Sequence, residues 1–215
     1  MAAEKSSNQP NAKQAILETA AKLFSELGYA GTTMRDIADA VGVLPGSLYA
    51  HIKNKESLLY TVVQSGIQKF LELETAITSA KGTPDEDLRS AIKFHVAVVA
   101  ESPQYTQVVF HQWRFLSAPM RKKVVDMRRR YADVFRKILE RGIEDGVFNP
   151  RMDISLEILS LLGSLNWIPE WYSKSGSYGP EEIGDKLADT LLHGICLKPV
   201  PAQSATARGR SAVRA

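Results

Sequence analysis

Apolar residues recur at helical spacing along nearly the whole chain, and no segment alternates apolar and polar residues as a β-strand does. The first apolar stripe runs from Ile16 to Leu27 and stops at Gly28, a residue type that commonly ends helices. Either Thr32 or Thr33 can cap the helix that follows. The pattern therefore predicts two successive helices in this part of the chain.

Proline and glycine residues divide the rest of this helical pattern. A short helix spans Pro45 to His51, and Asn54 is suited to cap a long helix that ends at Gly82-Thr83-Pro84. Further breaks delimit five more expected helices, at about 85–101, 104–117, 119–145, 152–172 and 180–197. The sequence thus predicts an all-α protein of about nine helices, of which the first three or four form a small head.

Two short helices of this head meet at Val41-Gly42-Val43, which is a helix-turn-helix signature. Gly42 supplies the left-handed residue that a tight turn between helices needs. Ile37 and Leu48 can hold the two helices together. The other face of the second helix is then free to enter a DNA major groove, which is about 12 Å wide.

The stretch TTMRDIADAVGVLPGSLYAHIKNKESLL resembles the tetracycline-repressor (TetR) family of bacterial regulators. The resemblance rests on Thr33, Ile37-Ala38, Gly42-Val43, Leu48-Tyr49-Ala50-His51 and Lys55 to Leu58. It implies that Thr33, Tyr49, His51 and Lys55 contact phosphates, that Arg35 reads a base, and that Pro45, Gly46 and Ser47 lie where the groove is approached. Two alternatives stay open: Arg35 pairs with Asp39, or His51 is a capping or packing residue.

In that family the rest of the chain is a helical domain that binds a ligand and dimerises. Here the stretches 111–148 and 161–195, within a match that covers about residues 105–197, resemble a subgroup that senses acyl-CoA thioesters. This resemblance rests on Trp113 to Leu116, Arg130-Tyr131, Asn166-Trp167 and Trp171-Tyr172. The candidate ligand-binding residues are His111, Trp113, Arg114, Arg130, Tyr131, Trp167 and Trp171.

An acyl-CoA needs an apolar slot for its chain and cations for its phosphates. Residues 111–141 carry ten Lys/Arg against three Asp/Glu, whereas residues 1–60 carry six of each. Arg128, Arg129 and Arg130 span about 200° of a helix, so at most two of them can face a pocket. A solvated face for this basic helix and a core role for the tryptophans remain alternatives.

The last two long helices carry more apolar residues than one inner face requires, which predicts a four-helix interface across a two-fold axis. The residues expected there are Ile154, Ile158, Leu161, Leu162 and Leu165, and Ile183, Leu187, Leu191 and Ile195. A homodimer would then read a palindromic operator.

The expected organisation is a flexible N-terminus at 1–10, a helix-turn-helix domain at 11–56, an effector-binding and dimerisation domain at 57–198, and a disordered basic tail at 199–215. The chain has no run of about 18 apolar residues and no secretory signal, and its single Cys196 cannot form an internal disulfide. A cytoplasmic protein without membrane partners is therefore expected.

Together these features predict a transcriptional repressor that is released from double-stranded operator DNA by a small molecule, with an acyl-CoA as the expected effector. A regulator of an efflux pump that senses a lipophilic drug shares the fold and remains an alternative. No nucleophile elbow, Walker loop or metal-spaced Cys/His cluster appears, so no catalytic residue, metal or cofactor is expected. An acyl-CoA-handling enzyme is the remote alternative. A DNA-architectural protein is a third possibility, but the neutral charge balance of residues 1–60 argues against binding DNA through bulk charge.

Overall fold

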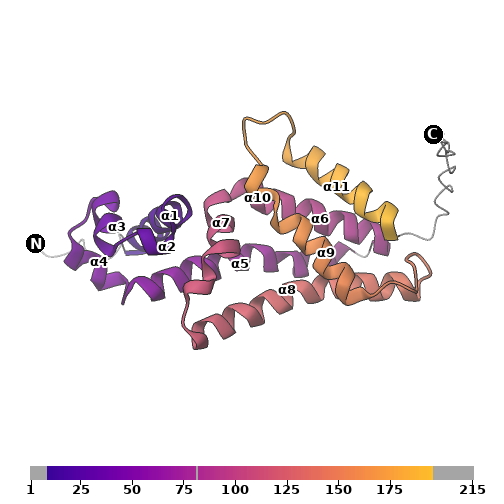
Figure 1. Cartoon of the computed structure of the whole chain (residues 1–215), viewed down its shortest axis with the longest axis horizontal. Coiled ribbons are helices and arrows are strands. Elements are labelled where there is room, and N and C mark those ends of the chain that lie inside the picture. The colour runs from indigo at the N-terminus through magenta and orange to yellow at the C-terminus, as the bar shows by residue number, and fades with distance from the viewer. Residues whose placement is uncertain (1–8, 81, 196–215) are drawn as a thin grey trace, which may run out of the picture.

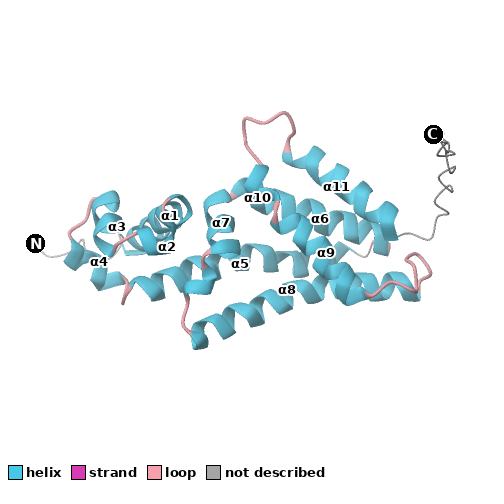
Figure 2. Cartoon of the chain, viewed as in Figure 1, coloured by secondary structure: helices cyan, strands magenta, loops and turns pink. Residues whose placement is uncertain are grey.

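The computed structural model describes residues 9–80 and 82–195, which form helices joined by short loops (Figures 1 and 2). The head contains α1 (Gln9–Glu26), α2 (Gly28–Gly31), α3 (Met34–Val41) and α4 (Pro45–His51). The body contains α5 (Lys55–Ala80), α6 (Pro84–Glu101), α7 (Pro103–His111), the 3-10 turn η1 (Trp113–Phe115), α8 (Ala118–Glu144), α9 (Ile154–Asn166), α10 (Ile168–Trp171) and α11 (Pro180–Ile195). The all-α prediction is confirmed.

The helix boundaries differ from the prediction at three places. The four-residue helices α2 and α10 were not expected as separate elements. The helix expected over 152–172 breaks near Trp167, because Pro169 has no N–H to bond to the carbonyl four residues before it. The helix expected over 104–117 ends at His111, and η1 follows it. Residues 1–8 and the expected tail lie outside the described residues, and α1 begins at Gln9, inside the N-terminus expected to be flexible.

Helix α5 runs from the head into the middle of the body and joins the two parts (Figure 1). Its buried residues Leu58, Leu59, Val62 and Val63 are completely covered. Helix α7 approaches α5 closely at Gly66, where an added Cβ would lie 2.5 Å from Val109 Cγ2. Any displacement of α5 at this point must therefore also displace α7, because the two helices are closely packed.

Ion pairs fasten α11 to α6. Arg89 contacts Asp189 at 2.5 Å and Asp185 at 3.7 Å, and Lys93 contacts Glu181 at 3.0 Å. The C-terminal half of α8 is tied to the start of α6 by Arg141 and the buried Asp87, which form a close ion pair. The Arg141–Asp87 pair thus joins α6 and α8, which both line the pocket described below.

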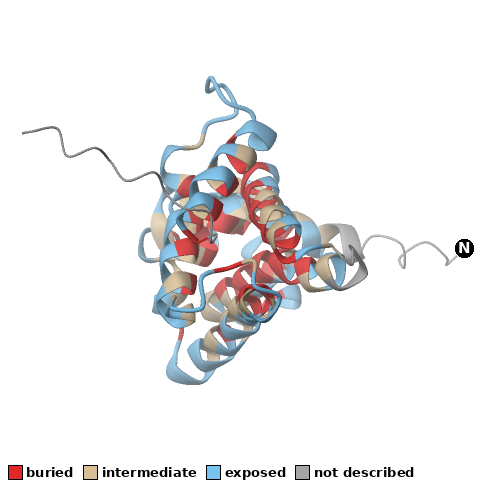
Figure 3. Cartoon of the chain, turned by 90° about the vertical axis from the view of Figure 1, so that its right-hand side faces the viewer, coloured by how far each residue is buried: buried red, intermediate tan, exposed pale blue. Residues whose placement is uncertain are grey.

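The residues expected at a dimer interface are placed differently from the prediction. Ile158, Leu161, Leu165, Ile183 and Ile195 are buried within the single chain, so that part of the prediction is wrong. Ile154, Leu162, Leu187 and Leu191 are partly buried. The exposed large apolar side chains on α9 are instead Leu156, at 61%, and Leu159, at 70%. Figure 3 shows that the buried residues face the interior of the helix assembly and leave the outer faces exposed.

None of the helices in the described part of the chain is long and apolar enough to cross a membrane.

Candidate DNA-binding surface and effector pocket

Local hydrogen bonds build the helix-turn-helix. The Thr33 hydroxyl accepts a hydrogen bond from Asp36 N–H at 3.1 Å, and Asp36 accepts one from Thr33 N–H at 2.8 Å, which caps α3. Hydrogen bonding with the backbone and then the side chain of Thr33 holds the pKa of Asp36 below its usual value. Gly42 ends the helix with φ +78°, and its N–H donates to the carbonyl of Ala38 at 3.0 Å.

The outer face of α4 is free. Leu48 is completely buried and anchors the helix to the head. The residues that the family resemblance assigns to the DNA side are exposed, namely Pro45, Gly46, Ser47, Tyr49 and His51. Leu44, just before the helix, is 77% exposed, and an apolar side chain there suits the methyl group of thymine.

Two cations lie beside this face. Arg35 is exposed, and its Nε is 3.9 Å from Asp39, a surface contact worth about 0.5 kcal/mol that leaves the guanidinium available. Lys55 Nζ lies 4.2 Å from the centre of the Tyr29 ring, and its partial burial lowers the pKa of this lysine while Asp36 opposes the shift. Arg35 is exposed and Lys55 is half-buried, and their roles as base reader and phosphate contact stay predictions.

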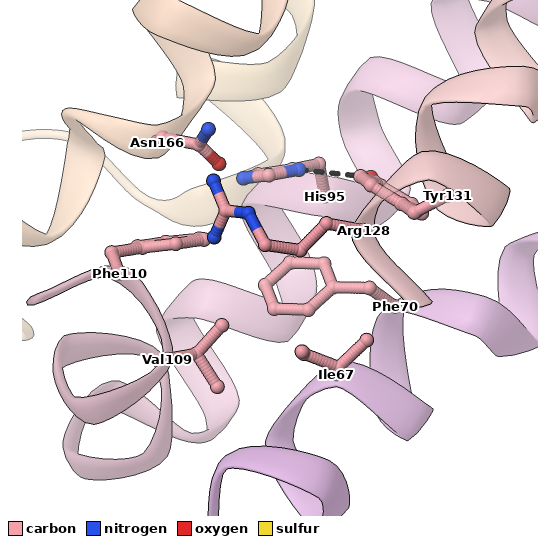
Figure 4. A pocket seen from close by; sticks show the side chains of 8 residues that line it. All are labelled: Ile67, Phe70, His95, Val109, Phe110, Arg128, Tyr131 and Asn166. Carbon is pink, nitrogen blue, oxygen red and sulfur yellow. Dashed lines mark hydrogen bonds between the residues drawn. The ribbon is translucent and has the colours of Figure 1, made fainter. Parts of the chain in front are cut away.

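A small cavity of about 50 Å³ lies in the body (Figure 4). Its lining residues come from α5 to α9 and are Ile67, Phe70, His95, Val109, Phe110, Arg128, Tyr131 and Asn166. Of these, Phe110, Arg128 and Asn166 are partly exposed and mark the side nearer to solvent, whereas the other five are buried. The cavity therefore has a deep end and a solvent-facing side.

The deep end carries one polar pair. His95 Nδ1 and the Tyr131 hydroxyl are 2.9 Å apart, and both residues are buried. Burial lowers the pKa of His95 to about 3, and burial raises the pKa of Tyr131 well above its ordinary value. At neutral pH both side chains are therefore uncharged.

The solvent-facing side carries an unpaired cation. On α8, Arg129 lies 3.7 Å from Asp126 and Arg130 lies 2.6 Å from Glu74, but no carboxylate in the described part of the chain pairs with Arg128. The Arg128 guanidinium lies 5.4 Å from the Trp113 ring, and Arg114 lies 5.9 Å from that ring. Burial and then the charge of Arg114 lower the pKa of Arg128. This arrangement favours an anion at the side of the cavity nearer to solvent.

Of the seven predicted ligand-binding residues, only Tyr131 lines the cavity. Trp113 and Arg114 lie next to Arg128. Arg130 lies outside the cavity, where it forms an ion pair with Glu74. The three other candidates lie elsewhere: His111 Nε2 is 2.8 Å from Glu170, and Trp167 and Trp171 are 60% and 50% exposed.

Three polar lining residues, Arg128, His95 and Asn166, were not in the predicted set. Arg128 shares a helix face with Tyr131, three residues on, and this spacing was a signal that favoured it over Arg130. His95 was not among the candidate residues, and Asn166 was noted only as part of the Asn166-Trp167 motif. No local pattern relates either of them to Tyr131.

A short segment connects this cavity to the head. Gln112 Oε1 accepts a hydrogen bond from Tyr29 N–H at 2.9 Å, and the Phe115 and Tyr29 rings are 5.6 Å apart. Ser117 N–H donates to Glu56 at 2.7 Å, and hydrogen bonds from Ser117 lower the pKa of Glu56. Residues 112–117 therefore contact both the cavity-side Arg128, through Trp113, and the first turn of α5.

This combination of a helix-turn-helix head, a helical body and an internal cavity defines a ligand-responsive transcription regulator. The profile "Bacterial regulatory proteins, tetR family" matches residues 16–62, and the profile "Tetracyclin repressor-like, C-terminal domain" matches residues 81–195. The chain belongs to the TetR family and is a transcriptional repressor with a ligand-binding domain.

Several known proteins resemble it over most of their length. The HTH-type transcriptional repressor KstR2 of Mycobacterium tuberculosis is 29% identical over 184 residues, which are 84% of this chain and 90% of the relative. The structure of PfmR from Thermus thermophilus matches with a TM-score of 0.78 at 31% identity and covers 86% of this chain and 99% of PfmR. AibR, solved in complex with isovaleryl coenzyme A and operator DNA, matches with a TM-score of 0.77 at 28% identity, covering 84% of this chain and 98% of AibR.

Proposed function

We propose that this repressor binds a palindromic operator as a homodimer and is released by an acyl-CoA thioester. The observation that carries the effector assignment is Arg128, an inward-turned guanidinium without a carboxylate partner, beside Trp113 and Arg114 at the solvent-facing side of an apolar cavity. An acyl chain suits the apolar walls, and a CoA phosphate suits the two guanidinium groups. AibR, which binds isovaleryl coenzyme A and operator DNA, supports the same class of effector.

The size of the cavity explains how such a ligand would act. A volume of about 50 Å³ is well below the roughly 300 Å³ of a typical small-molecule pocket. An acyl-CoA must therefore bind an expanded form of the body in preference to the form described here. A ligand that binds one conformation more tightly shifts the population toward that conformation.

Residues 112–117 provide the route by which expansion reaches the head. The Trp113 ring lies 5.4 Å from the Arg128 guanidinium at the cavity, whereas Gln112, Phe115 and Ser117 contact Tyr29 and the start of α5. If these residues follow the expanding pocket, the two recognition helices of the dimer change their separation, and the fit to two operator half-sites is lost. A tenfold loss of operator affinity requires about 1.4 kcal/mol of coupling.

Two matched variants on one helix test this proposal. Arg128→Met and Arg130→Met each remove one guanidinium, but only the first removes it from the cavity. We expect Arg128→Met to raise the isovaleryl-CoA or hexanoyl-CoA concentration for half-release of the operator by about 10- to 100-fold, because a charge-assisted hydrogen bond is lost. Arg130→Met should change it by less than about threefold, because an exposed ion pair contributes little. Operator affinity without effector, measured for both variants, is the control.

Equal effects of the two substitutions would remove Arg128 from the effector site. Release by a lipophilic cationic drug, with no response to any CoA thioester, would make the protein a drug-responsive regulator instead. The free acids isovalerate and hexanoate complete the comparison, and they should act poorly because they lack the phosphates.

A further inference from the structure

We propose that the deep end of the cavity selects effectors whose acyl group carries a keto oxygen, which accepts a hydrogen bond from His95 Nε2–H. The inference rests on the proposed function only in taking this cavity as the effector site. It adds the chemical group that the buried part of the ligand must present.

The first observation is a buried nitrogen without a partner. His95 is completely buried on α6, and its Nδ1 is engaged with the Tyr131 hydroxyl at 2.9 Å. Its Nε2 is also buried and makes no hydrogen bond to any residue of the described chain. The Leu165 carbonyl lies close enough to the ring to oppose the lowering of the pKa of His95, but it does not reach hydrogen-bonding geometry with Nε2.

The second step determines which nitrogen carries the proton. The Tyr131 hydroxyl keeps its own proton, because burial disfavours the phenolate. Within the described residues its one hydrogen-bonding partner is His95 Nδ1, so the hydroxyl donates to Nδ1. A neutral imidazole that accepts at Nδ1 carries its hydrogen on Nε2. His95 Nε2 is therefore a donor.

The third observation is where this donor points. Figure 4 shows the unbonded nitrogen of His95 directed toward the space between Arg128 and Asn166, on the side opposite the dashed bond to Tyr131. The remaining walls, including Ile67, Phe70 and Val109, are apolar. A purely hydrocarbon acyl group would cover the Nε2–H without bonding it, whereas a keto oxygen would both fill the space and accept the hydrogen bond.

The tautomer can be tested on the full-length protein without any ligand. Long-range proton–nitrogen NMR of the histidine side chains should show the Nε2–H form for one imidazole that stays neutral down to about pH 4. The double variant His95→Phe/Tyr131→Phe, which removes both partners and leaves no orphaned hydroxyl, should lose this signal and so assigns it. An Nδ1–H tautomer would overturn the inference, because the cavity would then present an acceptor.

The ligand preference is tested with CoA thioesters of one chain length. We expect 3-oxohexanoyl-CoA or 5-oxohexanoyl-CoA to bind at least about tenfold more tightly than hexanoyl-CoA in calorimetry, since an unpaired buried donor is costly. In the His95→Phe/Tyr131→Phe variant the preference should vanish or reverse. Equal or tighter binding of hexanoyl-CoA to the unmodified protein would overturn the keto inference and leave the acyl-CoA assignment standing.

If no CoA thioester binds, the proposed effector class fails. An NMR titration of the protein with acetone then tests the keto inference separately. Acetone should shift the His95 Nε2–H resonance of the unmodified protein, and a resonance that does not respond to acetone would overturn the inference. If the double variant does not fold, the tautomer measurement and the acetone titration still decide the question.

Discussion

The buried His95 makes the stability of the folded chain depend on pH in a window that can be calculated. Burial lowers its pKa to about 3 in the folded state, whereas an exposed histidine in the unfolded chain has a pKa of about 6.5. Between these two values the unfolded state binds one more proton than the folded state, so stability falls as the pH falls. The contribution is fully present above about pH 6.5 and declines through the window down to about pH 3.

The magnitude follows from the two pKa values. Acidification from pH 7 to pH 5 should remove about 2 kcal/mol of unfolding free energy through this one residue. For a chain of this size that corresponds to about 4–8 °C in melting temperature. Few carboxyl groups titrate above pH 5, so the window separates His95 from acid unfolding in general.

Urea unfolding at pH 7 and pH 5 and at one protein concentration measures the effect. The variant His95→Phe/Tyr131→Phe is the comparison, because it removes the imidazole together with the hydroxyl that bonds it. The unmodified protein should lose about 2 kcal/mol more than this variant between the two pH values. Equal losses in both proteins would refute the reasoning, because they would mean that His95 takes up its proton as readily in the folded state as in the unfolded state.

Three further outcomes concern DNA, assembly and packing. Arg35→Ala should relax base preference at one operator position by about 1–3 kcal/mol in a binding-site selection. Lys55→Ala should weaken binding to all DNA sequences similarly and lower the slope of log binding constant against log salt concentration by about one. The same change in base preference for both variants would contradict this division of roles. Leu159→Glu, at the most exposed apolar residue of α9, should give monomers in light scattering, and an unchanged dimer would place the interface elsewhere. Gly142→Ala should destabilise the chain by about 1–3 kcal/mol in urea unfolding, because its Cβ would lie 2.0 Å from the Phe148 ring; full stability would show that the ring can move aside.

Local rules account for what the sequence predicted well. The stop signal at Gly42 and the anchoring of the short helix by Leu48 depend on residues within one or two helical turns, and the structure contains both. The same holds for Pro84 and Pro103, each of which begins a helix near the predicted position. Such interactions are decided by neighbours in the chain, so their outcome can be deduced before any tertiary contact is known.

The effector pocket depends on contacts between distant segments, and here only the tertiary structure could decide. Periodicity shows that not all of Arg128, Arg129 and Arg130 can face one pocket, but Glu74 on another helix determines that Arg130 turns outward. His95 and Tyr131 are 36 residues apart, and their pairing arises because α6 and α8 pack together. Likewise, the sequence could not show which apolar residues of α9 and α11 are buried and which are exposed. The structure shows it, because α6 covers one side of α11. By itself, the sequence determined the head and the helical class of this protein, because short-range hydrogen bonds and helix signals specify them. The chemistry of the pocket was decided only when helix packing brought together side chains that no local pattern connects.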